Sequence, residues 1–154
     1  MSRSGYCDDL DPLDLGRWRA QVKSAIRGRR GQAFLQELAA AMDSMPVKEL
    51  ITEELINDDG DCCAIGVVCK TRGVDVSKID YEDSEQVGAA VGIARQLAAE
   101  IEYENDECGE RWEPVLRGGS RMADGQYARV QETPAERWQR MRKWVEKNIA
   151  RHEE

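Results

Sequence analysis

The chain has 154 residues, of which 41% are hydrophobic and 34% are charged, and its formal net charge at pH 7 is -8. This composition is too apolar for a disordered chain and fits one globular domain over residues 1–154. The longest apolar run, Cys62–Cys69, is far shorter than the roughly 20 residues that span a bilayer, so we expect no membrane segment. The N-terminus lacks the apolar stretch of a signal peptide, which favours a cytoplasmic protein.

The first predicted helix follows Asp11, a suitable N-cap, with Pro12 at the first helical position. Its apolar face is predicted to consist of Leu15, Trp18, Val22 and Ile26. We expect Gly28 and Gly31 to end this helix. A second helix is predicted over 32–45, and the short connection predicts that the two helices fold back on each other as a hairpin.

In the next part of the chain, two segments are compatible with either a helix or a strand. The segment 47–56 fits neither the helical nor the strand period, so helix and strand both stay open there. After Asp61, an apolar run that ends at Gly73 predicts a buried helix, although a core strand has the same pattern.

Weaker signals follow in the second half of the chain. Asp83 is expected to cap a further helix, and the helix after it is expected to end near Glu104. The chain then becomes rich in glycine and charge. Residues 112–117 and 126–131 can pair as strands, so we expect a surface insertion over 117–130 that is either a loop or a hairpin.

The final helix has the clearest start. Thr133 and Glu136 form a capping-box pattern, and Pro134 takes the first helical position. The core face of this helix is predicted to consist of Trp138, Met141, Trp144, Val145 and Ile149. Trp112, which precedes the helix, is also expected to lie in the core.

These elements together predict the fold class. We expect a mainly α, single-domain bundle of five to six helices with a small β-hairpin near 112–131. Residues 1–10 and 151–154 are expected to be flexible tails. The sequence shows no internal repeat and no linker that would divide the chain.

A basic stretch stands out against the negative net charge, because residues 16–30 hold six basic residues and no acidic one. The candidates for binding a partner or a phosphate are Arg19, Lys23, Arg27, Arg29 and Arg30. The alternative is that these charges are balanced within the protein and bind no partner. They lie toward the helix end, where they complement the helix dipole, and they could pair with residues 31–133, which hold 22 acidic and 9 basic residues.

The residues give little support to the chemistry of a typical enzyme. His152 is the single histidine, and the five cysteines show neither a disulfide framework nor a zinc-binding spacing. Cys62 or Cys63 could act as a nucleophile only if something lowers the pKa of its thiol, and a small buried side chain is the favoured interpretation. We therefore predict no catalytic residue, no metal site and no cofactor.

Distinctive motifs occur along most of the chain: Ser4-Gly5-Tyr6, Arg17-Trp18-Arg19, 29–35, Cys63-Ala64-Ile65-Gly66, Val91-Gly92-Ile93-Ala94, 100–107 and 133–138. In these motifs the chain resembles small proteins of unknown function that are encoded by tailed phages and prophages. The segment 61–67 also resembles the Cys-Cys-x-Gly-Val element of another phage-associated group. The resemblance implies expression in the cytoplasm of an infected bacterium, and it carries over no catalytic residue.

Three hypotheses about function follow. The leading one is a non-enzymatic phage or prophage accessory protein that binds and modulates a host or defence protein, or another phage protein. The second is a nucleic-acid-binding protein that uses the basic first helix. The third is a small enzyme with carboxylate or cysteine chemistry. A homo-oligomer formed through the last helix also stays open.

Overall fold

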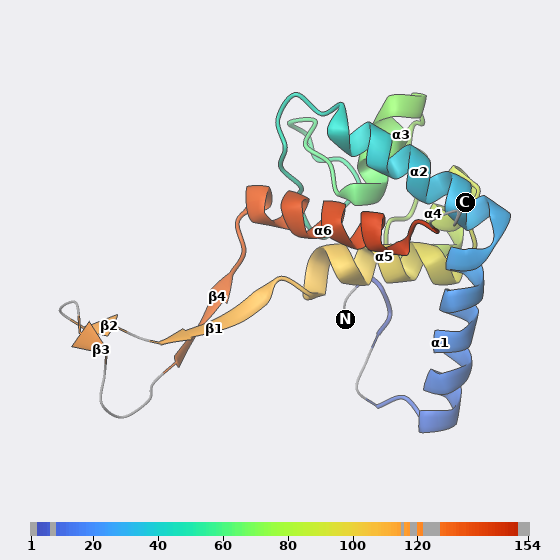
Figure 1. Cartoon of the computed structure of the whole chain (residues 1–154). Helices are drawn as coiled ribbons and strands as arrows, with labels where there is room; N and C mark the ends of the chain where they lie inside the picture. The colour runs from blue at the N-terminus through green and yellow to red at the C-terminus, as the bar shows by residue number, and fades with distance from the viewer. Residues whose placement is uncertain (1–2, 7–8, 115, 118–119, 122–126, 151–154) are drawn as a thin grey trace.

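The computed structural model describes residues 3–6, 9–114, 116–117, 120–121 and 127–150, which form a helical body with an extending β-hairpin arm (Figure 1). This confirms the predicted fold class, a mainly helical bundle with a small hairpin. The helices are α1 (Pro12–Arg27), α2 (Arg29–Asp43), α3 (Ala64–Arg72), the 3-10 turn η1 (Val76–Lys78), α4 (Ser84–Val91), α5 (Arg95–Glu107) and α6 (Pro134–Asn148). The strands are β1 (Glu110–Pro114), β2 (Leu116–Arg117), β3 (Ser120–Arg121) and β4 (Tyr127–Gln131).

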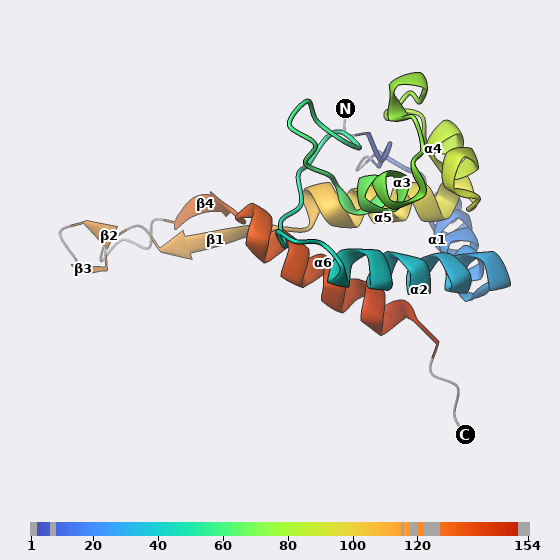
Figure 2. The ribbon, with the colours of Figure 1, turned by 90° about the horizontal axis from the view of Figure 1, so that it is seen from above.

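The connection between α1 and α2 differs from the predicted one. Asp11 caps α1 as expected, but α2 begins at Arg29, and only Gly28 separates the two helices. Gly31 lies inside α2, where a Cβ atom would clash with the carbonyl oxygen of Ala25, so this glycine permits a close approach instead of ending a helix. The predicted antiparallel hairpin is wrong, because α1 and α2 run at a steep angle to each other (Figures 1 and 2).

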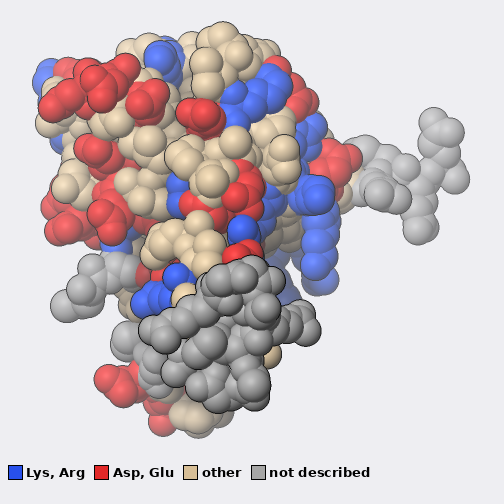
Figure 3. All heavy atoms as spheres, turned by 90° about the vertical axis from the view of Figure 1, so that its left-hand side faces the viewer, with Lys and Arg blue, Asp and Glu red and all other residues tan. Residues whose placement is uncertain are grey.

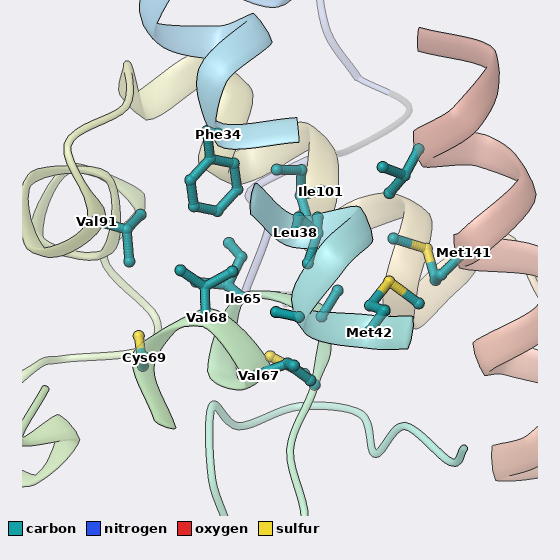
Figure 4. Close-up of a cluster of buried hydrophobic side chains, with 14 of the residues drawn as sticks. Phe34, Leu38, Met42, Ile65, Val67, Val68, Cys69, Val91, Ile101 and Met141 are labelled. Carbon is teal, nitrogen blue, oxygen red and sulfur yellow. The ribbon is translucent and has the colours of Figure 1, made fainter. Parts of the chain in front are cut away.

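The core lies between α2, α3, α4, α5 and α6 (Figure 4). Every residue from Ala64 to Cys69 is buried, and the segment is a helix, not the alternative strand. Gly73 ends α3 in the left-handed region at φ 72°, as predicted. The largest fully buried side chains include Leu35, Leu38, Met42, Ile65, Leu97, Ile101 and Met141. Burying each such side chain contributes about 1.5–3 kcal/mol.

The segment 47–56 is neither a helix nor a strand, although Ile56 forms an isolated bridge with Cys62. Its backbone forms hydrogen bonds with other segments of the chain. The Leu50 N–H donates to the Pro134 carbonyl at 3.1 Å, and the Ile51 N–H donates to the Cys62 carbonyl at 3.0 Å. The Leu50 side chain is fully buried. The segment therefore places apolar side chains in the core without a regular period, which explains why its pattern is ambiguous.

Helix α5 runs through the body with α4 at one end and the arm at the other (Figure 2). Residues 3–6, inside the predicted N-terminal tail, lie against it: the Tyr6 hydroxyl donates to the Glu100 carboxylate at 2.6 Å. Residues 1–2, 7–8 and 151–154 lie outside the described residues.

The arm consists of β1 and β4, which pair antiparallel, and of β2 and β3, which pair beyond them. This confirms the predicted small hairpin near 112–131, of which residues 115, 118–119 and 122–126 lie outside the described residues. Four of the five residues in β1 and four of the five in β4 are exposed. Trp112 is 67% exposed, so its predicted core position is wrong. The reason is that β1, the strand that contains Trp112, extends away from the helical body (Figure 1).

Helix α6 starts with the predicted capping box of Thr133 and Glu136. Met141 and Val145 are buried, and Trp138 packs partly buried against the core. Within the described part of the chain, no helix combines the length and the apolar character needed to cross a bilayer.

Candidate partner-binding surfaces

Four of the five predicted basic site residues lie on the last turns of α1 and the first turn of α2, and all four are exposed. Lys23, Arg27, Arg29 and Arg30, which we call the cationic corner, are exposed and form no ion pair with any described residue. Arg19 is different, because its Nη1 donates to the buried Glu100 carboxylate at 2.8 Å. Its charge is already balanced within the protein, so Arg19 is a weaker candidate for binding a partner.

The end of α6 meets the cationic corner. The Gln32 side chain on α2 donates to the Ile26 carbonyl of α1 at 2.7 Å and to the Asn148 carbonyl of α6 at 3.0 Å. It also accepts the Ala150 N–H at 2.7 Å. The last turn of α6, with the exposed Lys147, therefore lies next to the corner. The fold therefore brings a basic residue of the last helix close to basic residues that are distant from it in sequence.

All three arginines of α6 are instead paired internally. Arg142 forms a two-pronged pair with Asp43 of α2 at 2.9 and 3.0 Å. Arg140 binds Glu132 at 2.7 and 2.9 Å. Acidic residues of 31–133 therefore balance these arginines of α6, and the predicted pairing of the basic residues of 16–30 with this range is found at Arg19 and Glu100. In the view of Figure 3, acidic side chains gather at the left, whereas acidic and basic side chains lie next to each other at the centre and right.

Three of the four described cysteines lie in the interior, and Cys108 is half-buried. Cys62, Cys63 and Cys69 are buried, and burial raises the pKa of the Cys69 thiol to about 11. The Cys63 sulfur caps α3 by accepting the Gly66 N–H at 3.4 Å. Among the residues that the structure describes, no group of three or more His, Cys, Asp or Glu side chains could hold a metal ion.

The arm carries an aromatic face that sequence reasoning missed. Trp112 pairs with Arg129, and Pro114 pairs with Tyr127. Residues paired across an antiparallel ladder, and residues two apart along a strand, share one face. Trp112, Pro114 and Tyr127 therefore form one surface, which we call the arm face. Trp112 and Tyr127 are 67% and 58% exposed.

The base of the arm is fixed to the body by charged contacts. The Arg111 guanidinium binds Glu113 at 2.6 Å and Glu136 at the start of α6 at 2.7 Å. Arg129 forms an ion pair with Glu110 across the ladder. These pairs occupy the charged side chains near the base and leave the aromatic ones as the unpaired part of the arm face.

Comparison of the chain with protein-family models, with curated proteins and with solved structures finds no match. The resemblance to phage and prophage proteins therefore stays a prediction. The function is therefore inferred from the cationic corner and the arm face.

Proposed function

We propose that this protein is a non-enzymatic accessory protein that binds a host or phage protein through the arm face and modulates it. The observation that carries the proposal is the exposure of Trp112 and Tyr127 on one face of a two-stranded arm outside the helical body. The proposal includes the predicted setting, the cytoplasm of a phage-infected or lysogenic bacterium.

Two physical arguments support binding through the arm. An isolated two-stranded hairpin is at best marginally stable in water, and a partner that covers the arm face would supply the missing packing. Trp and Tyr are also the residue types that most often dominate the energy of protein–protein interfaces. The edges of β1 and β4 that face away from each other can additionally accept a strand from a partner.

The test is a quantitative pull-down from phage-infected bacterial cells with the tagged full-length protein. The proposal expects one partner at a constant ratio with the wild type and its loss with the double variant Trp112→Ser/Tyr127→Ser. The matched control is Val47→Ser/Tyr81→Ser, which removes two exposed apolar side chains, 60% and 41% exposed, from the helical body. Equal capture by both variants, or recovery of the bait alone, would contradict the proposal.

A second candidate function is nucleic-acid binding through the cationic corner, and the lack of internal pairs for its four side chains among the described residues favours it. Neutralising about four phosphates predicts a slope of about -3 to -4 in a plot of log affinity against log salt concentration. The variant Lys23→Gln/Arg27→Gln is expected to reduce the magnitude of this slope by about 2, whereas Lys78→Gln, distant in sequence and exposed, leaves it unchanged. Absence of DNA and RNA binding at low salt would exclude this function.

A further inference from the structure

A cleft of about 520 Å³ lies between the N-terminal segment, the first turns of α1 and the start of α4. Neither the arm nor the cationic corner contributes to it. Its walls include the side chains of Tyr6, Leu10, Asp14, Trp18, Glu85 and Arg95. The cleft thus combines aromatic and apolar walls with charged groups at its rim.

The aromatic wall is held in place by hydrogen bonds. The Trp18 indole N–H donates to the Tyr6 hydroxyl at 2.6 Å, and that hydroxyl donates to the Glu100 carboxylate at 2.6 Å. The Tyr6 ring also meets the Trp18 and Tyr103 rings edge to face, with centroids 6.0 and 4.6 Å apart. A wall built in this way needs little reorganisation when a ligand binds, which lowers the cost of binding.

One cation of the chain itself already lies on this wall. The Arg95 guanidinium lies 5.7 Å from the centroid of the Trp18 ring. This is the distance at which a cation is attracted by an indole ring. Arg95 is exposed and forms no ion pair with any described residue, so the ring is the group that its charge contacts.

The rim of the cleft is negative. Its acidic residues are Asp14, Glu82, Asp83 and Glu85, against the single basic residue Arg95. Asp83 is occupied in capping α4, where it accepts the Glu85 N–H at 2.9 Å. The carboxylates of Glu82 and Glu85 are exposed. An aromatic wall with a negative rim is complementary to a basic side chain with an apolar stem.

We propose that this cleft binds an arginine or lysine side chain of a protein partner, whose cationic group lies on the Trp18 ring within reach of the rim carboxylates. The stem of that side chain packs on Leu10, which is 38% exposed in the unbound protein. The site is separate from the arm face, so this inference holds or fails independently of the proposed function.

The test uses a fluorescein-labelled tetra-arginine peptide and the full-length protein, with binding followed by fluorescence anisotropy at low salt. Glu85→Gln is expected to weaken binding by about 2- to 5-fold, as for the loss of one partly screened ion pair. Asp58→Asn, which removes one exposed carboxylate outside the cleft, is the matched control and is expected to change binding by less than about 1.5-fold. Equal weakening by both variants would mean nonspecific attraction to a negative protein and would overturn the proposal.

Arg95 offers a second, opposite test. The Arg95 guanidinium covers the face of the Trp18 ring. Arg95→Gln should therefore free this face for the peptide and tighten peptide binding by about 2- to 5-fold. Lys78→Gln removes one exposed positive charge outside the cleft and should leave binding nearly unchanged. Weaker binding by Arg95→Gln, or preferential binding of a tetra-glutamate peptide, would contradict the proposed occupant.

A measurement on the wild type avoids any variant that fails to fold. Titration with N-acetyl-arginine methylamide should shift the indole N–H resonance of Trp18 in a saturable manner, whereas the norleucine analogue should not. Trp18→Phe assigns the resonance. Self-association of the protein, seen as a concentration-dependent mass in sedimentation, would contradict a separate protein partner as the occupant of the cleft.

Discussion

The Arg3 guanidinium binds the Asp106 carboxylate in a two-pronged ion pair, with Nε and Nη2 2.6 and 2.9 Å from the two carboxylate oxygens. The pair joins the N-terminal segment to the last turn of α5, across 103 residues of sequence. The two side chains are only 3% and 9% exposed. The Asp106 carboxylate also accepts the Asn105 side-chain N–H at 2.8 Å. This pair is therefore a structural joint of the fold.

Breaking this pair should destabilise the protein strongly. Asp106→Asn is expected to lower the free energy of unfolding by about 3–5 kcal/mol, because it removes the carboxylate that forms the two-pronged ion pair with the buried Arg3 charge. Urea denaturation followed by tryptophan fluorescence measures the change. Asp14→Asn is the matched control, since Asp14 and its partner Arg17 are 65% and 75% exposed. A change of about 0.5 kcal/mol or less is expected there.

Glu102 predicts a specific dependence of stability on pH. Its side chain is 1% exposed, and both carboxylate oxygens lack a hydrogen-bond partner among the described residues. Burial raises the pKa of Glu102 from 4.5 to about 8, although the nearby Arg3 opposes this and Asp106 adds to it. The folded protein therefore keeps a proton that the unfolded chain releases. Stability should fall as the pH rises from 4.5 to about 8, by up to about 1.4 kcal/mol per pH unit, and then level off.

The variant Glu102→Gln isolates this contribution. It cannot ionise, so its free energy of unfolding should depend less on pH in the same window, and it should exceed that of the wild type most clearly near pH 8. The measurement is a series of urea titrations between pH 5 and 9. A difference between variant and wild type that stays constant across the series would show that Glu102 does not titrate there.

The elements that the sequence predicts best are those with local signals. The caps at Asp11, Asp83 and Thr133 lie where each side chain can reach its own backbone N–H groups, so a few neighbouring residues decide the outcome. The burial of the Glu102 carboxylate and the close approach of two helices at Gly31 could not be predicted from neighbouring residues. The surroundings of both positions consist of residues that are distant in sequence or on a neighbouring helix, and only the packed structure shows them.

The same distinction applies to the candidate surfaces. The cationic corner is visible in the sequence because a run of basic residues on one helix is a local feature. The arm face is not visible in the sequence. A tryptophan such as Trp112 is predicted to lie in the core, and only the path of β1 shows that it is exposed. The cleft at Trp18 depends on three segments that meet only in the fold.

Two glycines in helices should respond in opposite ways to substitution by alanine. A Cβ atom at Gly66 on α3 would clash with the backbone carbonyl oxygen of Leu55, a buried core residue. Gly66→Ala should therefore destabilise the protein by about 1–3 kcal/mol. At Gly16 on α1 a Cβ atom would have no neighbour within 4 Å among the described residues, so Gly16→Ala should stabilise the protein by about 0.5–1 kcal/mol. Thermal unfolding by circular dichroism measures both changes.

The buried thiols predict slow modification of the native protein. At pH 8, a pKa of about 11 leaves about one Cys69 thiol in a thousand as the reactive thiolate, and the raised pKa of about 12 for Cys108 leaves fewer still. In a Cys7→Ser background, Ellman's reagent should therefore react with the native protein on the order of 100-fold more slowly than with the same protein in urea. Mass spectrometry of partly labelled protein identifies each modified residue. Rapid stoichiometric labelling of Cys62 or Cys63 in the native state would contradict their burial. It would also support the hypothesis of a cysteine nucleophile, because a thiol that is accessible to the reagent is also accessible to a substrate.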